Sequence, residues 1–216
     1  MPPIGVIRGD TGPANWGSLN PEYVLCAEGT EQSPIGIPYD AASNPADLAF
    51  AYQPGALNIV NNGHAIQVNV DEGSTVEIDG QTYTLNQLHF HNPSEHTAAG
   101  RFQPLEMHLV HSNADGGLAV ISVLVAEGAE NPALVDIVAN LPAEEGDPIT
   151  IDGASVDASA LLPADQSYWR YDGSLTTPPC SEGVKWFVMV NPITASMPSH
   201  NAIADLHRNN VRPFQP

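Results

Sequence analysis

The stretch Gln81-Thr-Tyr-Thr-Leu-Asn-Gln-Leu-His-Phe-His91 decides the fold of this chain. Its composition, rich in threonine, aromatic residues and leucine, is typical of a β-strand. Because successive side chains of a strand point to opposite faces, we expect one face to carry Tyr83, Leu85, Gln87, His89 and His91. The opposite face is then expected to carry Thr82, Thr84, Asn86, Leu88 and Phe90. His89 and His91 would lie one pleat apart, where both rings can reach a single metal ion.

A second predicted strand, Leu105–His111, follows after a turn region of roughly a dozen residues, so the two strands can be antiparallel neighbours. Glu106, His108 and Val110 share one face of it, and His108 can stand opposite the histidine pair. Three neutral imidazoles with an open fourth position are the ligand set of a catalytic zinc site. Glu106 is placed to hold the other ring nitrogen of a ligand. Spacing alone leaves open a second interpretation, in which these histidines are only polar residues of the core or surface.

The rest of the pattern predicts a single domain over residues 1–216. Short strand patterns recur with turn residues between them, at Leu57–Val60, His64–Val70, Thr75–Ile78, Leu118–Val125, Ile149–Ile151 and Val184–Val190. Two short helical patterns interrupt them, one opened by Pro132 and one over about Ser199–Arg208. The first 50 or so residues are expected to be loop. The predicted fold class is mostly β (α+β), with a central, largely antiparallel twisted β-sheet and a few short peripheral helices.

The charge balance excludes two classes of partner. Six basic residues stand against 25 acidic ones, a formal net charge of −19. A nucleic-acid-binding protein needs a basic face, and so does a protein that docks on an anionic membrane surface. No apolar run reaches the length of about 18 residues that a membrane-spanning helix requires. The acidic surface is either an ordinary solvated surface or an adaptation to salt, and the sequence does not separate the two.

The two cysteines, Cys26 and Cys180, are too far apart to form a CxxC motif. A bond between them would indicate an exported protein, whereas two free thiols would suit the cytosol. Residues 1–6 show neither the basic nor the apolar region of a signal peptide. Either the signal has been removed, or the protein is cytosolic.

Several ordered motifs of the chain resemble the α-class carbonic anhydrases. They are Gln32-Ser-Pro-Ile35, Asn61-Asn-Gly-His64, Gln87-Leu-His-Phe-His91, Ser94-Glu-His-Thr97, Glu106-Met-His-Leu-Val-His111, Gly173-Ser-Leu-Thr-Thr-Pro-Pro179 and Arg212-Pro213. Together they extend over almost the whole chain. The resemblance implies a zinc-dependent lyase that reversibly hydrates CO₂ to bicarbonate and a proton, by attack of zinc-bound hydroxide.

The resemblance also implies roles for individual residues. His89, His91 and His108 correspond to the ligands of one Zn²⁺ per chain, with Gln87 and Glu106 as their hydrogen-bond partners. Thr176 corresponds to a hydroxyl that orients the hydroxide and donates its own proton to Glu95. For substrate binding, Thr177 corresponds to a polar contact for bicarbonate. The apolar wall that holds CO₂ corresponds to Val110, Val120, Leu175 and Trp186.

By the same resemblance, His64 is the proton shuttle, and Asn62 and Gln67 order the intervening waters. Strict alternation would place His64 and Gln67 on opposite faces, so a β-bulge is expected between them. The other histidines are expected to be structural, with His96 and His111 in buried hydrogen-bond networks and His200 and His207 on the surface of a helix.

Cys26 and Cys180 match the cysteine positions of exported bacterial members of the family, which implies a disulfide and a periplasmic or secreted protein whose signal has been removed. A homodimer is a further expectation from these members. Three departures from the family pattern stand out. Ser18 replaces a tyrosine of the proton-transfer water network, Asn92 stands where animal members often have tryptophan, and the sequence ends at Pro216, before the usual final strand, so a truncated or a short native end is expected.

Two rival functions remain from the sequence. The first is a non-catalytic family member that acts as an extracellular binding or scaffold module, and such members usually lose a ligand histidine. Here all three candidate ligands are present, together with Glu95 and Thr176. The second rival is a zinc hydrolase that acts on esters, which would use the same nucleophile.

Overall fold

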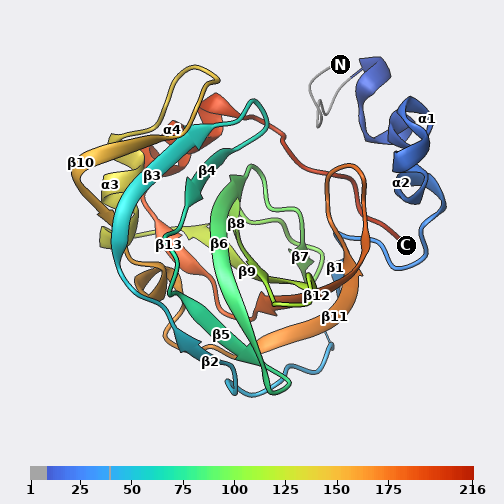
Figure 1. Cartoon of the computed structure of the whole chain (residues 1–216), viewed down its shortest axis with the longest axis horizontal. Coiled ribbons are helices and arrows are strands. Elements are labelled where there is room, and N and C mark those ends of the chain that lie inside the picture. Colours follow the sequence, from blue (N-terminus) through green and yellow to red (C-terminus); the bar gives the residue numbers. More distant parts are fainter. Residues whose placement is uncertain (1–8, 39) are drawn as a thin grey trace.

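The computed structural model describes residues 9–38 and 40–216. Residues 1–8, which include the stretch searched for a signal peptide, lie outside the described residues. A large mixed sheet of 11 strands forms the centre of the described part, with the main path β10-β3-β4-β6-β8-β9-β12-β11 (Figure 1). Its strands are β2 Ala49–Ala51, β3 Gly55–Asn61, β4 Ile66–Asn69, β5 Thr75–Ile78, β6 Gln81–His91, β8 Leu105–Ser112, β9 Leu118–Glu127, β10 Ile149–Val156, β11 Tyr168–Ser174, β12 Glu182–Met189 and β13 Ile193–Ala195. A separate parallel pair joins β1 (Gly36–Ile37) to β7 (Thr97–Ala98).

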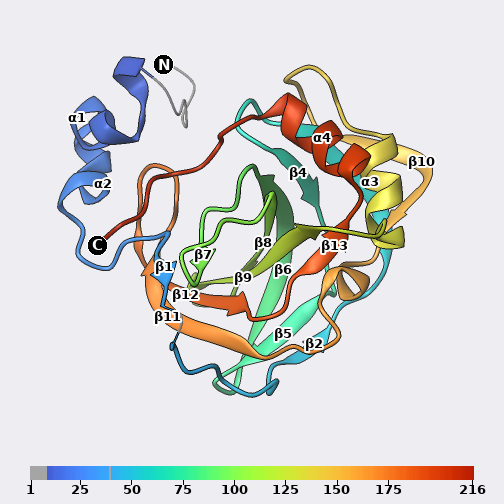
Figure 2. The same cartoon turned by 180° about the vertical axis from the view of Figure 1, so that it is seen from behind.

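The helices are short and peripheral, as the sequence predicts. They are α1 Trp16–Leu19, α2 Leu25–Glu28, α3 Val135–Ala139 and α4 Met197–Leu206. In both views α3 and α4 lie together beside β3 and β10, whereas α1 and α2 lie on the other side of the molecule, near the C-terminus (Figures 1 and 2). None of the described helices is long and apolar enough to cross a membrane.

The two strands that carry the histidines are antiparallel neighbours, as predicted. The last five residues of β6, Gln87 to His91, each pair with a residue of β8, and His89 pairs with His108. The alternation of β6 is interrupted, because the register shifts between Leu85 and Gln87. This bulge turns Tyr83 and Leu85 into the hydrophobic core, where both are almost fully buried. The prediction that they share a face with the histidines was therefore wrong.

The hydrophobic core explains why this end of β6 has a fixed orientation. Leu88 and Phe90 are 0% and 2% exposed and belong to a cluster that continues into β8 and β9. Each fully buried side chain of this size contributes about 1.5–3 kcal/mol to the free energy of unfolding. If the pairing register slipped by one residue, Leu88 and Phe90 would turn away from the core. Their burial therefore keeps His89 and His91 on the side away from the core.

Most strand pairs are antiparallel, but β9 is paired in parallel with both β12 and β13. β11 was missed at the sequence level because its residues Tyr168–Ser174 mix charged and aromatic side chains with a glycine. The first 50 residues also contain more structure than predicted, since short helices and β1 interrupt the expected loop.

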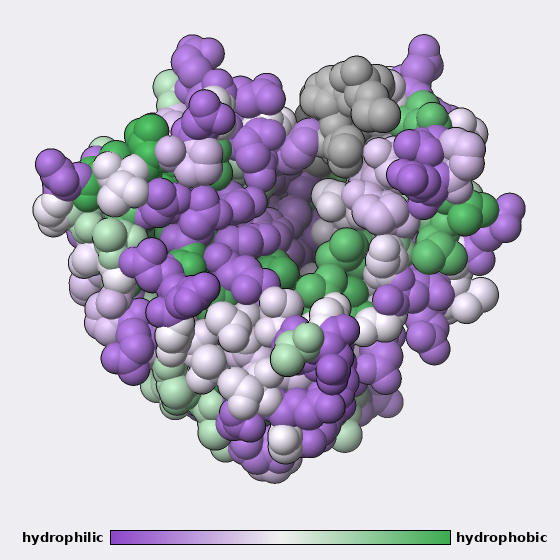
Figure 3. Space-filling model, in the orientation of Figure 1, coloured by the Kyte–Doolittle hydropathy of each residue, from purple (hydrophilic) through white to green (hydrophobic). Residues whose placement is uncertain are grey.

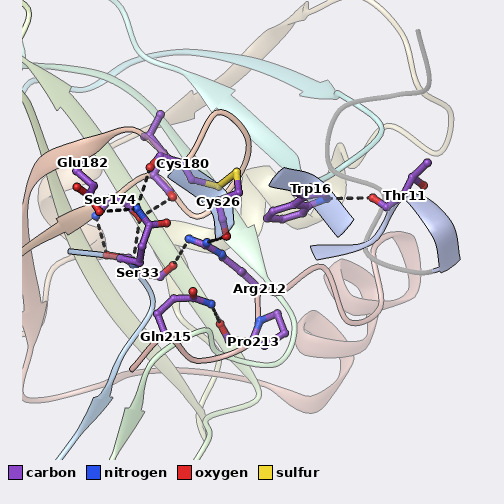
Figure 4. Close-up of a disulfide and its surroundings, with 12 residues drawn as sticks. Thr11, Trp16, Cys26, Ser33, Ser174, Cys180, Glu182, Arg212, Pro213 and Gln215 are labelled. Carbon is purple, nitrogen blue, oxygen red and sulfur yellow. Dashed lines mark hydrogen bonds between the residues drawn. A yellow bond between two sulfur atoms is a disulfide. The ribbon is translucent and has the colours of Figure 1, made fainter. Parts of the chain in front are cut away.

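A disulfide between Cys26 and Cys180 ties the N-terminal segment to the segment that follows β11 (Figure 4). Arg212 lies beside it, and its guanidinium donates to the backbone carbonyls of Ser33 (2.8 Å) and Cys26 (3.1 Å). Gln32 donates from its side-chain amide to the carbonyl of Cys180. The C-terminal segment is therefore fixed to the same place, and the backbone N–H of Gln215 donates to the carbonyl of Pro34.

Candidate metal centre

The molecule is hollowed near the centre of one face, and hydrophilic residues gather along one side of the hollow (Figure 3). The cavity there has a volume of about 160 Å³. It is lined by Trp16, Asn62, His64, Ala65, Gln67, Gln87, His89, His91, Glu95, Thr176, Thr177, Asn210 and Arg212. Segments from both ends of the chain and from the central sheet thus enclose one small polar space.

His89, His91 and His108 converge beside this cavity. Each offers a ring nitrogen, and these three atoms lie within 4.8 Å of one another. The ring centroids are separated by 5.0 Å (His89–His91), 5.2 Å (His89–His108) and 4.5 Å (His91–His108). β6 supplies two of the rings and β8 supplies the third, directly across the ladder from His89.

The second nitrogen of each ring is held by an oxygen acceptor. His89 Nδ1 lies 2.9 Å from Gln87 Oε1, and His108 Nε2 lies 2.7 Å from Glu106 Oε1. His91 Nδ1 lies 2.7 Å from the backbone carbonyl oxygen of Asn210. A carbonyl, or a carboxylate that is ionised, can only accept, so each of these ring nitrogens carries the proton and the other one bears a lone pair. His91 Nε2 is buried and has no hydrogen-bond partner among the described residues.

Burial lowers the pKa of all three rings, and that of His89 falls well below its ordinary value. The neighbouring imidazoles lower the pKa of His89 further. Neutral rings with converging lone pairs suit a cation of borderline softness such as Zn²⁺. The residues present therefore fit a three-histidine zinc site.

Glu106 connects this site to a second buried histidine. Its Oε1 lies 2.7 Å from both His108 Nε2 and His96 Nδ1, and the Ser122 hydroxyl donates to the same oxygen at 2.6 Å. Burial by itself raises the pKa of Glu106, but the two imidazoles hold it well below its usual range. His96 also lies 2.7 Å from the Tyr171 hydroxyl, so it occupies a buried network, as predicted.

Glu95 is a buried carboxyl close to the His91 ring. The backbone N–H of Arg212 donates to its Oε1 at 2.7 Å, while Oε2 has no partner among the described residues and lies 3.6 Å from His91 Nε2. Burial raises the pKa of Glu95 to about 7, against the lowering effects of His108, the Arg212 N–H and the Thr176 hydroxyl. Thr176 and Glu95 both line the cavity.

His64 lies in the turn between β3 and β4 and lines the cavity together with Asn62 and Gln67. The Asn62 amide donates to Gln67 Oε1 at 3.2 Å and accepts from the backbone N–H of His64 at 3.0 Å. Because β4 begins only at Ile66, His64 is outside the alternation of the strand. No bulge is needed to bring it to the same cavity as Gln67, which corrects that expectation.

The four apolar residues expected to form a wall do cluster, but they are not among the residues that line the cavity. Val120 and Trp186 are buried together, and Val110 and Leu175 pack against them. The Trp186 ring lies 4.9 Å from the His108 ring, centroid to centroid. The cluster therefore lies next to the three histidines, and Thr177 lines the cavity itself.

Some expectations about other residues need correction. His200 is buried, at 3% exposed, and is not a surface residue. His207 Nε2 lies 2.8 Å from Asn61 Oδ1, so it takes part in a contact between segments. His111 is in a buried network as predicted, 2.7 Å from the Tyr52 hydroxyl. Ser18 is exposed and donates to the carbonyl of Asn15, away from the cavity-lining residues.

Sequence reasoning missed three contributors to the site. Asn210 holds His91 through its backbone carbonyl, Arg212 holds Glu95 through its backbone N–H, and Tyr171 contacts His96 through its hydroxyl. The first two act through the backbone, so their side-chain types give no signal. The side chain of Asn210 adds two donations, to the carbonyls of His64 (3.0 Å) and Phe90 (2.9 Å).

Comparison with known proteins agrees with this geometry. The family model for eukaryotic-type carbonic anhydrase matches residues 11–216. A carbonic anhydrase of Pectobacterium carotovorum is 44% identical over 97% of this chain and 86% of its own length. The α-carbonic anhydrase of Thermovibrio ammonificans, solved with the inhibitor sulfanilamide, superposes with a TM-score of 0.93 at 39% identity, covering 97% of this chain and 94% of that one. The α-carbonic anhydrase of Photobacterium profundum gives a TM-score of 0.90 at 40% identity, over 97% and 95% of the two chains. The chain belongs to the α-class, or eukaryotic-type, carbonic anhydrases, enzymes that hydrate CO₂.

Proposed function

We propose that this chain hydrates CO₂ with one zinc ion held by His89, His91 and His108. The observation that carries the proposal is the set of three buried rings whose second nitrogens are each held by an oxygen acceptor, so that their lone pairs converge. Zinc held by these three rings would supply Lewis acidity and make a nucleophile available at neutral pH.

Glu95 and Thr176 orient the attacking oxygen. When its carboxyl is ionised, Glu95 can only accept, so the Thr176 hydroxyl then donates to it and the Thr176 oxygen is left to accept from the nucleophile. The Arg212 N–H keeps one carboxylate oxygen of Glu95 in place. This arrangement restricts the rotation of the attacking oxygen before the reaction. Positioning of this kind lowers the entropic part of the activation free energy.

The substrate lies between the two kinds of surface described above. CO₂ has little to hydrogen-bond, so we assign its contact to Val110 and Leu175, the half-buried members of the apolar cluster. Val120 and Trp186 are buried behind them, with Trp186 next to His108. Thr177, at the cavity wall, supplies a polar contact for bicarbonate. The apolar side thus favours the substrate, and the polar side favours the charged product.

His64 takes the proton that each turnover leaves behind. An imidazole titrates close to neutrality, and this one lies at the cavity with Asn62 and Gln67, whose amides can order water between it and the metal centre. Burial lowers the pKa of His64, and the carboxylate of Glu145 raises it.

The protein works outside the cytosol, in the periplasm or after secretion. The Cys26–Cys180 disulfide supports this, because such bonds persist in oxidising compartments. The homodimer expected from the resemblance stays a prediction.

The deciding experiment combines zinc content with CO₂ hydration, measured on purified protein before and after treatment with a chelator. We expect one zinc per chain and an activity that is lost with the metal and restored by zinc. His108→Ala should lower both zinc content and activity, whereas Ser112→Ala, at the exposed end of the same strand, serves as the matched control. A His108→Ala protein with full zinc and full activity would contradict the ligand assignment.

A further inference from the structure

Beside the turn that carries His64 lies a small polar group that the proposed reaction does not use. It consists of His207, at the C-terminal end of α4, and Glu145, in the loop between α3 and β10. Asn61, the last residue of β3, joins both segments to the turn that carries His64. His207 is half-buried and Glu145 is exposed.

Asn61 determines which nitrogen of His207 carries a proton. Its amide Nδ2 donates to the carbonyl of Pro142 at 3.2 Å, and its Oδ1 accepts from the backbone N–H of Gly63 at 3.1 Å. Oδ1 is therefore an acceptor, and His207 Nε2, at 2.8 Å from it, must be the donor. Nδ1 of His207 is then the position that gains and loses a proton, and the bond to Asn61 persists in both states.

The carboxylate of Glu145 is seated against the same turn. Gly63 has φ +84°, and a Cβ built on it would meet the carboxyl carbon of Glu145 at 2.9 Å. The loop is held there by the backbone N–H of Gly146, which donates to the carbonyl of Asn61 at 3.1 Å. Glu145 thus lies beside the residue that precedes His64.

The three groups sense one another electrostatically. The pKa of His207 is lowered first by burial and then by the positive charge of His64, and Glu145 raises it. Glu145 also raises the pKa of His64, against the larger effect of burial. The remaining charges on this end of α4, Asp205 and Arg208, pair with each other. Two imidazoles that repel each other's protons, next to one carboxylate, hold a single proton more readily than two.

We propose that His207 continues the proton path from His64 to solvent, and that Glu145 is a positioning residue whose charge acts on both imidazoles. This inference rests on the shuttle role proposed for His64. A proton leaves the imidazole of His64 as one N–H bond breaks, and it is taken up at His207 Nδ1 as another forms. It passes from there to a base of the buffer, while Nε2–H stays on Asn61.

The first test is an NMR titration of the histidine ring protons in the zinc-loaded enzyme. Glu145→Gln should lower the pKa of both His64 and His207, because it removes a nearby negative charge. His64→Ala should raise the pKa of His207, because it removes a like charge. Glu144→Gln, which removes a charge from the same loop, is the control and should leave both titrations within error of the parent.

The second test is kinetic and uses low buffer concentrations. Glu145→Gln and His207→Gln should lower kcat roughly threefold, as expected for a change of about half a pKa unit in the path, with kcat/KM unchanged and with rescue by imidazole. Glutamine at position 207 can still donate to Asn61 but cannot titrate. In a His64→Ala background both substitutions should have no further effect, since they act through His64, whereas a folding defect would lower kcat in either background.

The outcomes separate the two proposals. If His64→Ala lowers kcat selectively but Glu145→Gln and His207→Gln leave kcat and the His64 titration unchanged, the outer path is wrong and the shuttle stands. If His64→Ala leaves kcat unchanged, or lowers kcat/KM equally without imidazole rescue, the shuttle fails and the outer path fails with it.

Discussion

One oxygen of Glu106 holds His108: Oε1 lies 2.7 Å from Nε2 of the ring. The same oxygen also lies 2.7 Å from His96 Nδ1, so the candidate ligand is part of a fully buried network. A ligand ring that is fixed in this way does not have to be ordered when metal binds. The expected consequence is a zinc affinity that depends on Glu106, a residue outside the proposed set of three histidine ligands.

Glu106→Gln should therefore weaken zinc binding by about 10- to 100-fold, because the amide lacks the charge of the carboxylate and replaces one of its two accepting oxygens with a donor. Competition against a chromophoric chelator measures the affinity directly. Glu77→Gln, at an exposed position of β5, is the control for loss of one acid. An unchanged affinity in Glu106→Gln would show that His108 needs no such partner.

Thr176→Ala should lower kcat/KM by about 100-fold, because the attacking oxygen loses its orientation before the first irreversible step. Stopped-flow CO₂ hydration under low substrate concentrations measures this ratio. Thr176→Ser retains the hydroxyl and should recover most of the loss. If serine is as slow as alanine, the methyl group and not the hydroxyl is what matters at this position.

Removal of the disulfide should destabilise the protein strongly, since it closes a loop with a sequence separation of 154 residues. The chain-entropy treatment gives about 5 kcal/mol as an upper bound for such a loop. We expect no titratable thiol in the untreated protein and a lower melting temperature for Cys26→Ser/Cys180→Ser. Reduced parent protein should melt where the double variant melts. Two free thiols in freshly purified protein would contradict the bridge and the argument for export.

Salt should stabilise this protein. With a formal net charge of −19, self-repulsion is relieved as the Debye length shortens to about 3 Å near 1 M salt. The melting temperature in sodium chloride should rise over this range. Chloride is preferred to sulfate, which stabilises proteins by exclusion from their surface. A flat or falling curve would favour an ordinary solvated acidic surface over adaptation to salt.

Acid should destabilise the fold through His111, whose pKa is lowered by burial to about 4. Below the ordinary pKa of about 6.5 the unfolded chain binds a proton that the folded state refuses, so stability is lost as the pH falls from 6.5 towards 4. The loss amounts to about 3 kcal/mol over this window. Denaturant unfolding of the zinc-loaded protein at several pH values measures it.

His111→Gln should flatten that dependence, although it also disturbs the contact with Tyr52. Tyr52→Phe is the matched control, because it removes the same contact and leaves the imidazole in place. The pH dependence should survive in Tyr52→Phe. Parallel slopes in the parent and His111→Gln would assign the acid sensitivity to other groups.

The pairing of β6 with β8 could be predicted from sequence, because alternation and the short connection leave few other arrangements. The position of the bulge at Asn86 could not, since Tyr83 and Leu85 fit the alternating pattern on either face until the core is seen. β11 escaped detection for a related reason: edge strands carry mixed polarity, and Arg170 and Asp172 are exposed there. The alternating sequence pattern shows which residues share a face of a strand, but it does not show which elements pack against that face.

The three histidines of the candidate centre could be picked out from spacing, yet their environment could not. The hydrogen bond that orients His91 is accepted by a backbone carbonyl, and every residue type has one. His207 looked like a surface helix residue because its partner, Asn61, is distant in sequence. Contacts of this kind depend on tertiary packing, which a pattern of residue types does not encode.

The hydrogen bond from His91 to Asn210 also sets an order of events in synthesis. The two residues are 119 positions apart, and the ribosome therefore finishes all three histidines well before Asn210 exists. A nascent chain that captures metal early does so with a His91 ring that can still rotate. The orientation of all three rings is thus complete only once the segment after α4 has docked against the sheet.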